Sequence, residues 1–236
     1  MKYSIIALFT LGLFVACNDK KAEGNLHITG NIKGLKKGTL YIQKVVDAKL
    51  IPIDTIEIDG NSAFESELTI KSPEMYYIFL DRGVTNSLDN NLLFFAEPGN
   101  IDIQTSLEYF LSDAKITGSK NQEKYDEFKK VNSRFNDESL TLIEQKFKAY
   151  KNKNFKTIDS IAERENKNIK RRYLYVTNFA LNNKDYEVSP YLALTEIPDI
   201  NLKYLDTIQK SMTPKVANSK YGKKLTEFYQ QRKKLE

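Results

Sequence analysis

The sequence has very few of the residues that form disulfides or bind transition metals. Its 236 residues include one cysteine, Cys17, and one histidine, His27. A disulfide needs two cysteines, and thiol–disulfide exchange needs a second thiol or another partner beside the thiolate. A protein metal site needs several ligands, and His27 has no second histidine or free cysteine to accompany it. The composition therefore excludes internal disulfides, and we predict no metal, no cofactor and a structural role for His27.

Long apolar runs and familiar catalytic motifs are also absent from the sequence. The longest apolar run, Ser4–Val15, has about a dozen residues, whereas a membrane-spanning helix needs about 20. No phosphate-binding loop, nucleophile elbow, zinc signature or dinucleotide fingerprint is present. We assign no catalytic residue and expect the protein not to be an enzyme.

Residues 1–16 have the organisation of an export signal, because Lys2 precedes the apolar run and the small residue Ala16 ends it. The residues Phe14-Val15-Ala16-Cys17 resemble a bacterial lipobox, with phenylalanine where leucine is usual. The resemblance implies cleavage between Ala16 and Cys17 and a diacylglyceryl group on the Cys17 thiol. The alternatives are an ordinary secretory signal with a cysteine there by chance, and an uncleaved anchor.

We therefore expect a signal peptide at 1–16, a tether at 17–24 and a lipid anchor, with fatty acids such as palmitate, in the cell envelope. The expected location is the outer membrane, facing the periplasm, and Asn18-Asp19-Lys20-Lys21 lacks the acidic run of a surface-export signal. Acylation of Cys17 leaves the mature chain without a free thiol. Its stability then depends on apolar burial, for which a chain of this length is sufficient.

The two halves of the chain differ in charge. Residues 18–117 hold 10 Lys and Arg against 15 Asp and Glu, a balance of −5. Residues 118–236 hold 25 against 16, a balance of +9. This asymmetry suggests two parts.

Residues 25–117 alternate with the period of two that is typical of strands buried on one face. Leu26, Ile28 and Ile32 share one face, and Phe64, Leu68 and Ile70 share another. Further strands are predicted at 39–45, 75–80, 92–96, 101–105 and 109–116, and Asp59-Gly60-Asn61-Ser62 is predicted to close a hairpin. Seven or eight short strands with regular turns favour an antiparallel β-sandwich.

Residues 118–236 change to helical spacing. Ser119 to Gln122 match a capping box, after which Tyr125, Phe128, Val131 and Phe135 recur at helical intervals. Further helical stretches carry Leu140, Ile143, Phe147 and Tyr150, and then Ile158, Ile161, Ile169 and Val176. Ser189-Pro190 and Thr213-Pro214 are predicted to cap two later helices. The predicted fold class is α+β, with a sandwich followed by five to seven helical segments.

The order of several segments resembles a known family. "NLHITGNIKGLKKGTLYIQKV", the "IEIDGNSAF" hairpin and "LLFFAEPGNIDIQ" resemble a domain of unknown function from lipoproteins of Bacteroidetes-type bacteria. There it usually precedes a thioredoxin-like module of the thiol-specific antioxidant or alkyl hydroperoxide reductase type. This sequence departs from that pattern because it holds no C-x-x-C pair, so thiol exchange by this polypeptide alone is not expected.

Four groups of residues are candidate sites. The acidic residues Asp54, Glu57, Asp59, Glu65 and Glu67 form either a solvated strand face or a paired-carboxylate hydrolase site, depending on register. Asp81 to Asn91 is an exposed connection or a loose calcium loop. Lys220, Lys223, Lys224, Arg232, Lys233 and Lys234 form a solvated face or a contact with anionic headgroups, and nucleic acid is not expected. Thr55, Ser160 and Thr207 lie in Asp-Ser/Thr-Ile triplets that resemble an O-glycosylation signal.

The leading hypothesis is a lipid-anchored, non-catalytic module that binds or scaffolds another envelope protein or a glycan. The alternative is an accessory of thiol–disulfide or peroxide metabolism that acts with a separate thioredoxin-like protein. A hydrolase built on the acidic hairpin is a third hypothesis.

Overall fold

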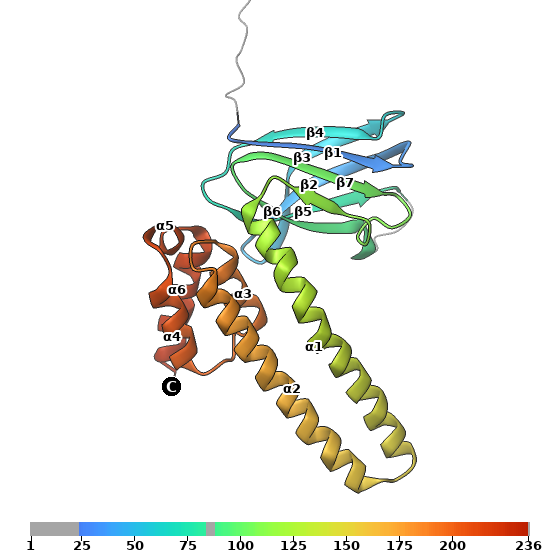
Figure 1. Ribbon diagram of the computed structural model, residues 1–236. Helices are drawn as coiled ribbons and strands as arrows, with labels where there is room; N and C mark the ends of the chain where they lie inside the picture. The colour runs from blue at the N-terminus through green and yellow to red at the C-terminus, as the bar shows by residue number, and fades with distance from the viewer. Residues whose placement is uncertain (1–23, 84–87, 236) are drawn as a thin grey trace, which may run out of the picture.

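The computed structural model describes residues 24–83 and 88–235. Two packed β-sheets form the N-terminal part, and helices form the C-terminal part (Figure 1). The strands are β1 (Leu26–Lys33), β2 (Lys37–Val46), β3 (Lys49–Asp59), β4 (Ala63–Leu68), β5 (Glu74–Asp81), β6 (Asn91–Ala96), β7 (Gly99–Ser106) and β8 (Lys115–Thr117). The predicted α+β class, with a sandwich before a helical region, is confirmed.

The strands form two four-stranded sheets with the orders β4-β1-β7-β8 and β3-β2-β5-β6. All pairs are antiparallel except β1 with β7, which run parallel. Leu26, Ile28 and Ile32 point into the core between the sheets, as their alternation predicts. Sheet β3-β2-β5-β6 is the one that faces the helical region (Figure 1).

Two predictions about the strands are wrong. The turn at Gly60 has the expected positive φ of 87°, but β3 and β4 belong to different sheets, so the chain crosses between layers there instead of forming a paired hairpin. Residues 109–116 are mostly turn, and only Lys115–Thr117 pair as a strand. The hydroxyl of Ser106 donates to Asp113 at 2.6 Å, and the amide of Asp113 donates to the carbonyl of Tyr109, so local turn bonds replace a strand ladder there.

The helices are α1 (Lys120–Lys151), α2 (Phe155–Asn182), α3 (Val188–Glu196), α4 (Leu202–Ser211), α5 (Pro214–Ala217) and α6 (Lys220–Lys233). The two stretches predicted over 125–150 form one continuous 32-residue helix, α1. Thr213-Pro214 begins α5 as predicted, whereas Ser189-Pro190 lies inside α3, which begins at Val188. None of the helices in the described ranges is long and apolar enough to cross a bilayer.

Helices α1 and α2 form an arm that extends beyond the sandwich, with their connecting turn at its far end (Figure 1). Along the far half of the arm the two helices meet through a small apolar cluster of Leu142, Ala149, Ile158 and Ile161. The near half of the arm packs with α3 to α6 and with one face of the sandwich.

Strand β6 joins the two cores because both of its faces are buried. Phe94 points into the sandwich core, and Phe95 points into the helical core. A strand buried on both faces has a continuous apolar sequence, which explains the run Leu92-Leu93-Phe94-Phe95-Ala96.

Candidate functional site

The predicted lipidation site lies outside the described residues. Ala16 and Cys17 precede Gly24, where the described part begins. Strand β1 starts at Leu26. The preceding residue, Asn25, bonds the backbone of Ile70 and accepts from the amide of Gly99.

The predicted O-glycosylation residues are exposed but lie in regular elements. Thr55 is in β3, Ser160 in α2 and Thr207 in α4. The hydroxyl of Thr207 also donates to the carbonyl of Lys203 at 2.8 Å. The structure does not bring the three positions together, and their modification stays a prediction.

His27 lies on the exposed face of β1, with its Nδ1 3.8 Å from Glu67 on the neighbouring strand β4. In the described part of the chain, no three His, Cys, Asp or Glu side chains are grouped as metal ligands. In the predicted calcium loop, Asp81 accepts a hydrogen bond from the amide of Gly83 at 2.7 Å, and residues 84–87 of that loop lie outside the described ranges.

The predicted paired-carboxylate site does not form. Glu57 lies opposite Thr39 of β2, whose hydroxyl donates to it at 3.1 Å, and Glu65 lies opposite Thr29 of β1. Because β3 and β4 are in different sheets, Glu57 and Glu65 are not cross-strand neighbours. The register therefore contradicts the pairing of Glu57 with Glu65 on which the hydrolase hypothesis depends, and it favours a solvated strand face.

The basic C-terminal segment is partly used to hold α6 in place. Lys220 forms an ion pair with Glu74 of β5, and the hydroxyl of Tyr221 accepts a hydrogen bond from the amide of Met75 at 2.9 Å. Arg232 donates to the carbonyl of Ile200 at 2.7 Å. Lys223, Lys224 and Lys233 remain exposed on the surface of α6.

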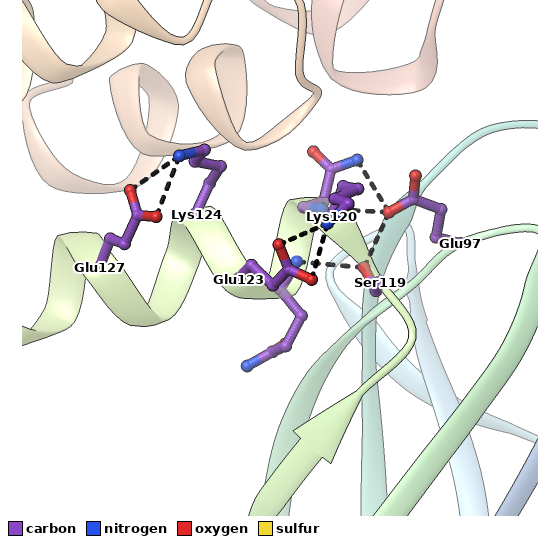
Figure 2. A network of polar contacts seen from close by, with 8 residues as sticks. Glu97, Ser119, Lys120, Glu123, Lys124 and Glu127 are labelled. Carbon is purple, nitrogen blue, oxygen red and sulfur yellow. Dashed lines mark hydrogen bonds and ion pairs between the residues drawn. The ribbon is translucent and has the colours of Figure 1, made fainter.

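A polar network that the sequence does not predict lies at the start of α1, where the sandwich meets the helices (Figure 2). Glu97, from the turn after β6, accepts hydrogen bonds from the hydroxyl of Ser119 at 2.8 Å and from the amide of Asn121 at 3.0 Å. Ser119 also caps α1 by accepting from the amide of Gln122 at 3.0 Å, as the capping box predicts. The side chain of Gln122 does not complete the box, because it accepts instead from the amide of Phe95 at 2.8 Å.

Asn121 carries this network into the helical region. Its Oδ1 accepts from the amide of Val188, and its Nδ2 donates to the buried carboxylate of Glu187 at 2.9 Å. A second carboxylate oxygen of Glu187 lies 3.8 Å from Nζ of Lys215. An open pocket of about 500 Å³ lies beside these groups, with Lys71, Pro73 and Pro98 among its lining residues.

The hydrogen bonds of this junction hold the sandwich and the helices together. The carboxylates of Glu97 and Glu187 already accept hydrogen bonds from groups that fix the start of α1 and of α3. These bonds tie the turn after β6 and the start of α3 to the first turn of α1. Two features of the sequence belong to this junction, the turn Glu97-Pro98-Gly99 and the helix cap at Ser119. The sequence does not show that Glu97 contacts Ser119.

Half-buried tyrosines line the same junction. Tyr125, Tyr191 and Tyr221 each make edge or tilted contacts with the ring of Phe95 or with one another. Burial raises the pKa of Tyr125 to about 12 and raises the pKa values of Tyr191 and Tyr221 further. These hydroxyls therefore stay protonated at neutral pH and support packing.

The far half of α1 carries a surface of a different kind. Leu140, Ile143, Phe147 and Tyr150 follow one another at intervals of three and four residues, and each is more than half exposed. We call these four residues the distal stripe. The periodicity of the sequence predicted the shared face, but in the fold Leu142 and Ala149 pack against α2 and the distal stripe has no partner in the described chain.

The N-terminal part of the chain matches a family model. No curated protein matches the chain. Residues 26–125, from the start of β1 to the second turn of α1, match the family model described as Domain of unknown function (DUF4369), so the sandwich carries a domain whose function is unknown.

Proposed function

We propose that this protein is a lipid-anchored lipoprotein of the cell envelope, a non-catalytic binding module whose binding surface is the far half of the α1–α2 arm. The observation that carries the proposal is the distal stripe. Contiguous exposed apolar patches on soluble proteins usually mark interaction sites, whereas single exposed apolar residues are ordinary.

The anchor predicts a covalent modification of Cys17. Cells expressing the full chain and fed an alkyne fatty acid should incorporate the label into this protein, and Cys17→Ser should lose essentially all of it. Each buried methylene of the acyl chains contributes about 0.8 kcal/mol, so the labelled protein should sediment with membranes and the variant should not. An unlabelled wild-type protein would show that the anchor is wrong, and recovery of Met1 by sequencing would show that the signal is not cleaved.

The arm predicts a localised contact. A photoreactive amino acid placed at Phe147 in the full chain should give a covalent adduct in cells, identified as lipid or protein by mass spectrometry. The same amino acid at Tyr204 of α4, which is 38% exposed but outside the arm, is the matched control and should give little adduct. Equal yields at both positions would contradict a binding role for the arm.

The alternative role as an accessory of a thioredoxin-like protein rests on the family resemblance. The same crosslinking experiment tests it, because an adduct containing a thioredoxin-fold protein would favour that role.

A further inference from the structure

The turn that joins α1 to α2 concentrates positive charge at the far end of the arm. Residues 146–156 include five lysines and no acidic side chain. We call this segment the basic tip. Its formal charge of +5 equals that of the whole chain, so the other 225 residues together carry no net formal charge.

Three of these lysines are not neutralised by neighbours. Lys146 pairs with Glu165 at 2.6 Å, and Lys148 pairs with Glu144 at 2.5 Å. In the part of the chain that the structure describes, no ion pair is formed by Lys151, Lys153 or Lys156, and each is exposed.

The basic tip also exposes aromatic rings. Phe147 is 71% exposed and Phe155 is 69% exposed, and Tyr150 is more than half exposed. Phe147 and Tyr150 belong to the distal stripe on α1, and Phe155 lies across the connecting turn at the start of α2. Exposed aromatic residues mixed with lysine are typical of segments that lie at a membrane–water interface.

A shallow groove between the ends of the two helices adds cationic groups. It has a volume of about 540 Å³, and Lys148, Lys156 and Arg164 line it together with Asn152 and Asn154. Such a lining suits a phosphate group of a lipid headgroup, which accepts hydrogen bonds from several cations.

We propose that the basic tip docks on a bilayer surface that bears anionic headgroups, with Phe147, Tyr150 and Phe155 entering the headgroup layer. This inference rests on the proposed function, because it names what the arm binds. The tip is the end of a projecting arm (Figure 1), so its rings can enter a soft interface directly, whereas a protein partner would have to supply a matching groove. The lysines reach the headgroups along their flexible stems.

Vesicle flotation tests the role of charge. A chain starting at Asn18 keeps every helix and strand described and lacks the lipid anchor. Its binding to vesicles therefore measures the contribution of the protein surface without that of the anchor. It should float with phosphatidylcholine vesicles that contain about a third phosphatidylglycerol, and not with pure phosphatidylcholine. Combining Lys151→Gln, Lys153→Gln and Lys156→Gln should reduce partitioning about 100-fold, since each lysine near an anionic surface contributes about 1 kcal/mol.

The matched control removes the same charge elsewhere. Lys223→Gln, Lys224→Gln and Lys233→Gln alter three exposed lysines of α6, and these changes should leave partitioning within about twofold. A loss in this control equal to that of the tip variant would overturn the proposal, because vesicle binding would then depend on the net charge of the chain or on the lysines of α6. Glycerol phosphate at millimolar concentration should not compete, and competition would show that the tip binds a free phosphate compound instead of a bilayer.

A fluorescent reporter tests the depth of the rings. The chain contains no tryptophan, so Phe147→Trp introduces a single tryptophan, which can be excited apart from the tyrosines, at a position that is already exposed. Its emission should shift to shorter wavelength on adding anionic vesicles, and Tyr204→Trp on α4 should not shift. No shift at either position, or no flotation of the wild-type chain, would overturn the proposal. A protein adduct at Phe147 in cells without vesicle binding would overturn this inference and leave the proposed function standing, whereas unlabelled Cys17 would overturn the anchor alone.

Discussion

Replacing Gly118 with alanine should destabilise the protein by about 2–5 kcal/mol. Gly118 joins β8 to α1 with a φ of 95°, a conformation that costs an L-residue about 1–2 kcal/mol. The added Cβ would also lie 1.9 Å from the backbone oxygen of Asn100 in β7. Relieving that overlap requires a backbone shift, and such overpacking costs about 1–3 kcal/mol more. Urea denaturation followed by circular dichroism measures the sum.

Gly60→Ala separates the two contributions to this loss. Gly60 has a φ of 87°, close to that of Gly118, but no atom lies within 4 Å of the position of its Cβ. It should lose only the conformational part, about 1–2 kcal/mol. Equal losses for Gly60→Ala and Gly118→Ala would mean that β7 and the start of α1 separate without cost, contrary to the close packing at the junction.

Phe95→Ala should lower the free energy of unfolding by about 3–5 kcal/mol. The ring of Phe95 is fully buried and makes edge contacts with Tyr191, Tyr125 and Tyr221 at centroid distances of 5.3 to 6.3 Å. Truncation leaves a cavity between β6 and the helices, and a rigid aromatic surround collapses poorly into such a space. The near-ultraviolet signal of the tyrosines should weaken as well, because their packing depends on this ring.

Phe147→Ala is the matched control for Phe95→Ala. It removes the same atoms from a side chain that is 71% exposed, so its stability should stay within about 0.5 kcal/mol of wild type. A loss comparable to that of Phe95→Ala would show that the distal stripe is covered by protein in solution, and would contradict its availability as a binding surface.

The fold class could be predicted from the sequence because both periodicities are carried by local patterns. Alternation at Leu26, Ile28 and Ile32 identifies a strand with one buried face, and the Ser119 cap identifies the start of α1. The assignment of strands to sheets could not be predicted, because the turn at Gly60 suits both a hairpin and a crossing between layers. That choice depends on which partner β4 finds across the core, and β1 is the partner it takes.

The candidate sites were predictable to a smaller extent. Helical spacing placed Phe147 and Tyr150 on one face of a helix, but spacing alone does not distinguish a buried face from an exposed one. The junction was missed because its contacts join residues far apart in sequence, such as Asn121 with Glu187. The lysines of 146–156 were visible in the sequence, yet their significance depends on the two helix ends that the turn brings together.

Because α1 is one continuous helix, a small rotation at its start moves its far end by a large distance. Its first turn is fixed to β6 through Gln122, and at 1.5 Å per residue its 32 residues extend about 48 Å from that point. A rotation of about 10° at this fixed end would move the opposite end by about 8 Å. A small change in packing around Phe95 that tilted α1 would therefore give a large displacement at Lys151, so the packing at the junction fixes the position of the basic tip.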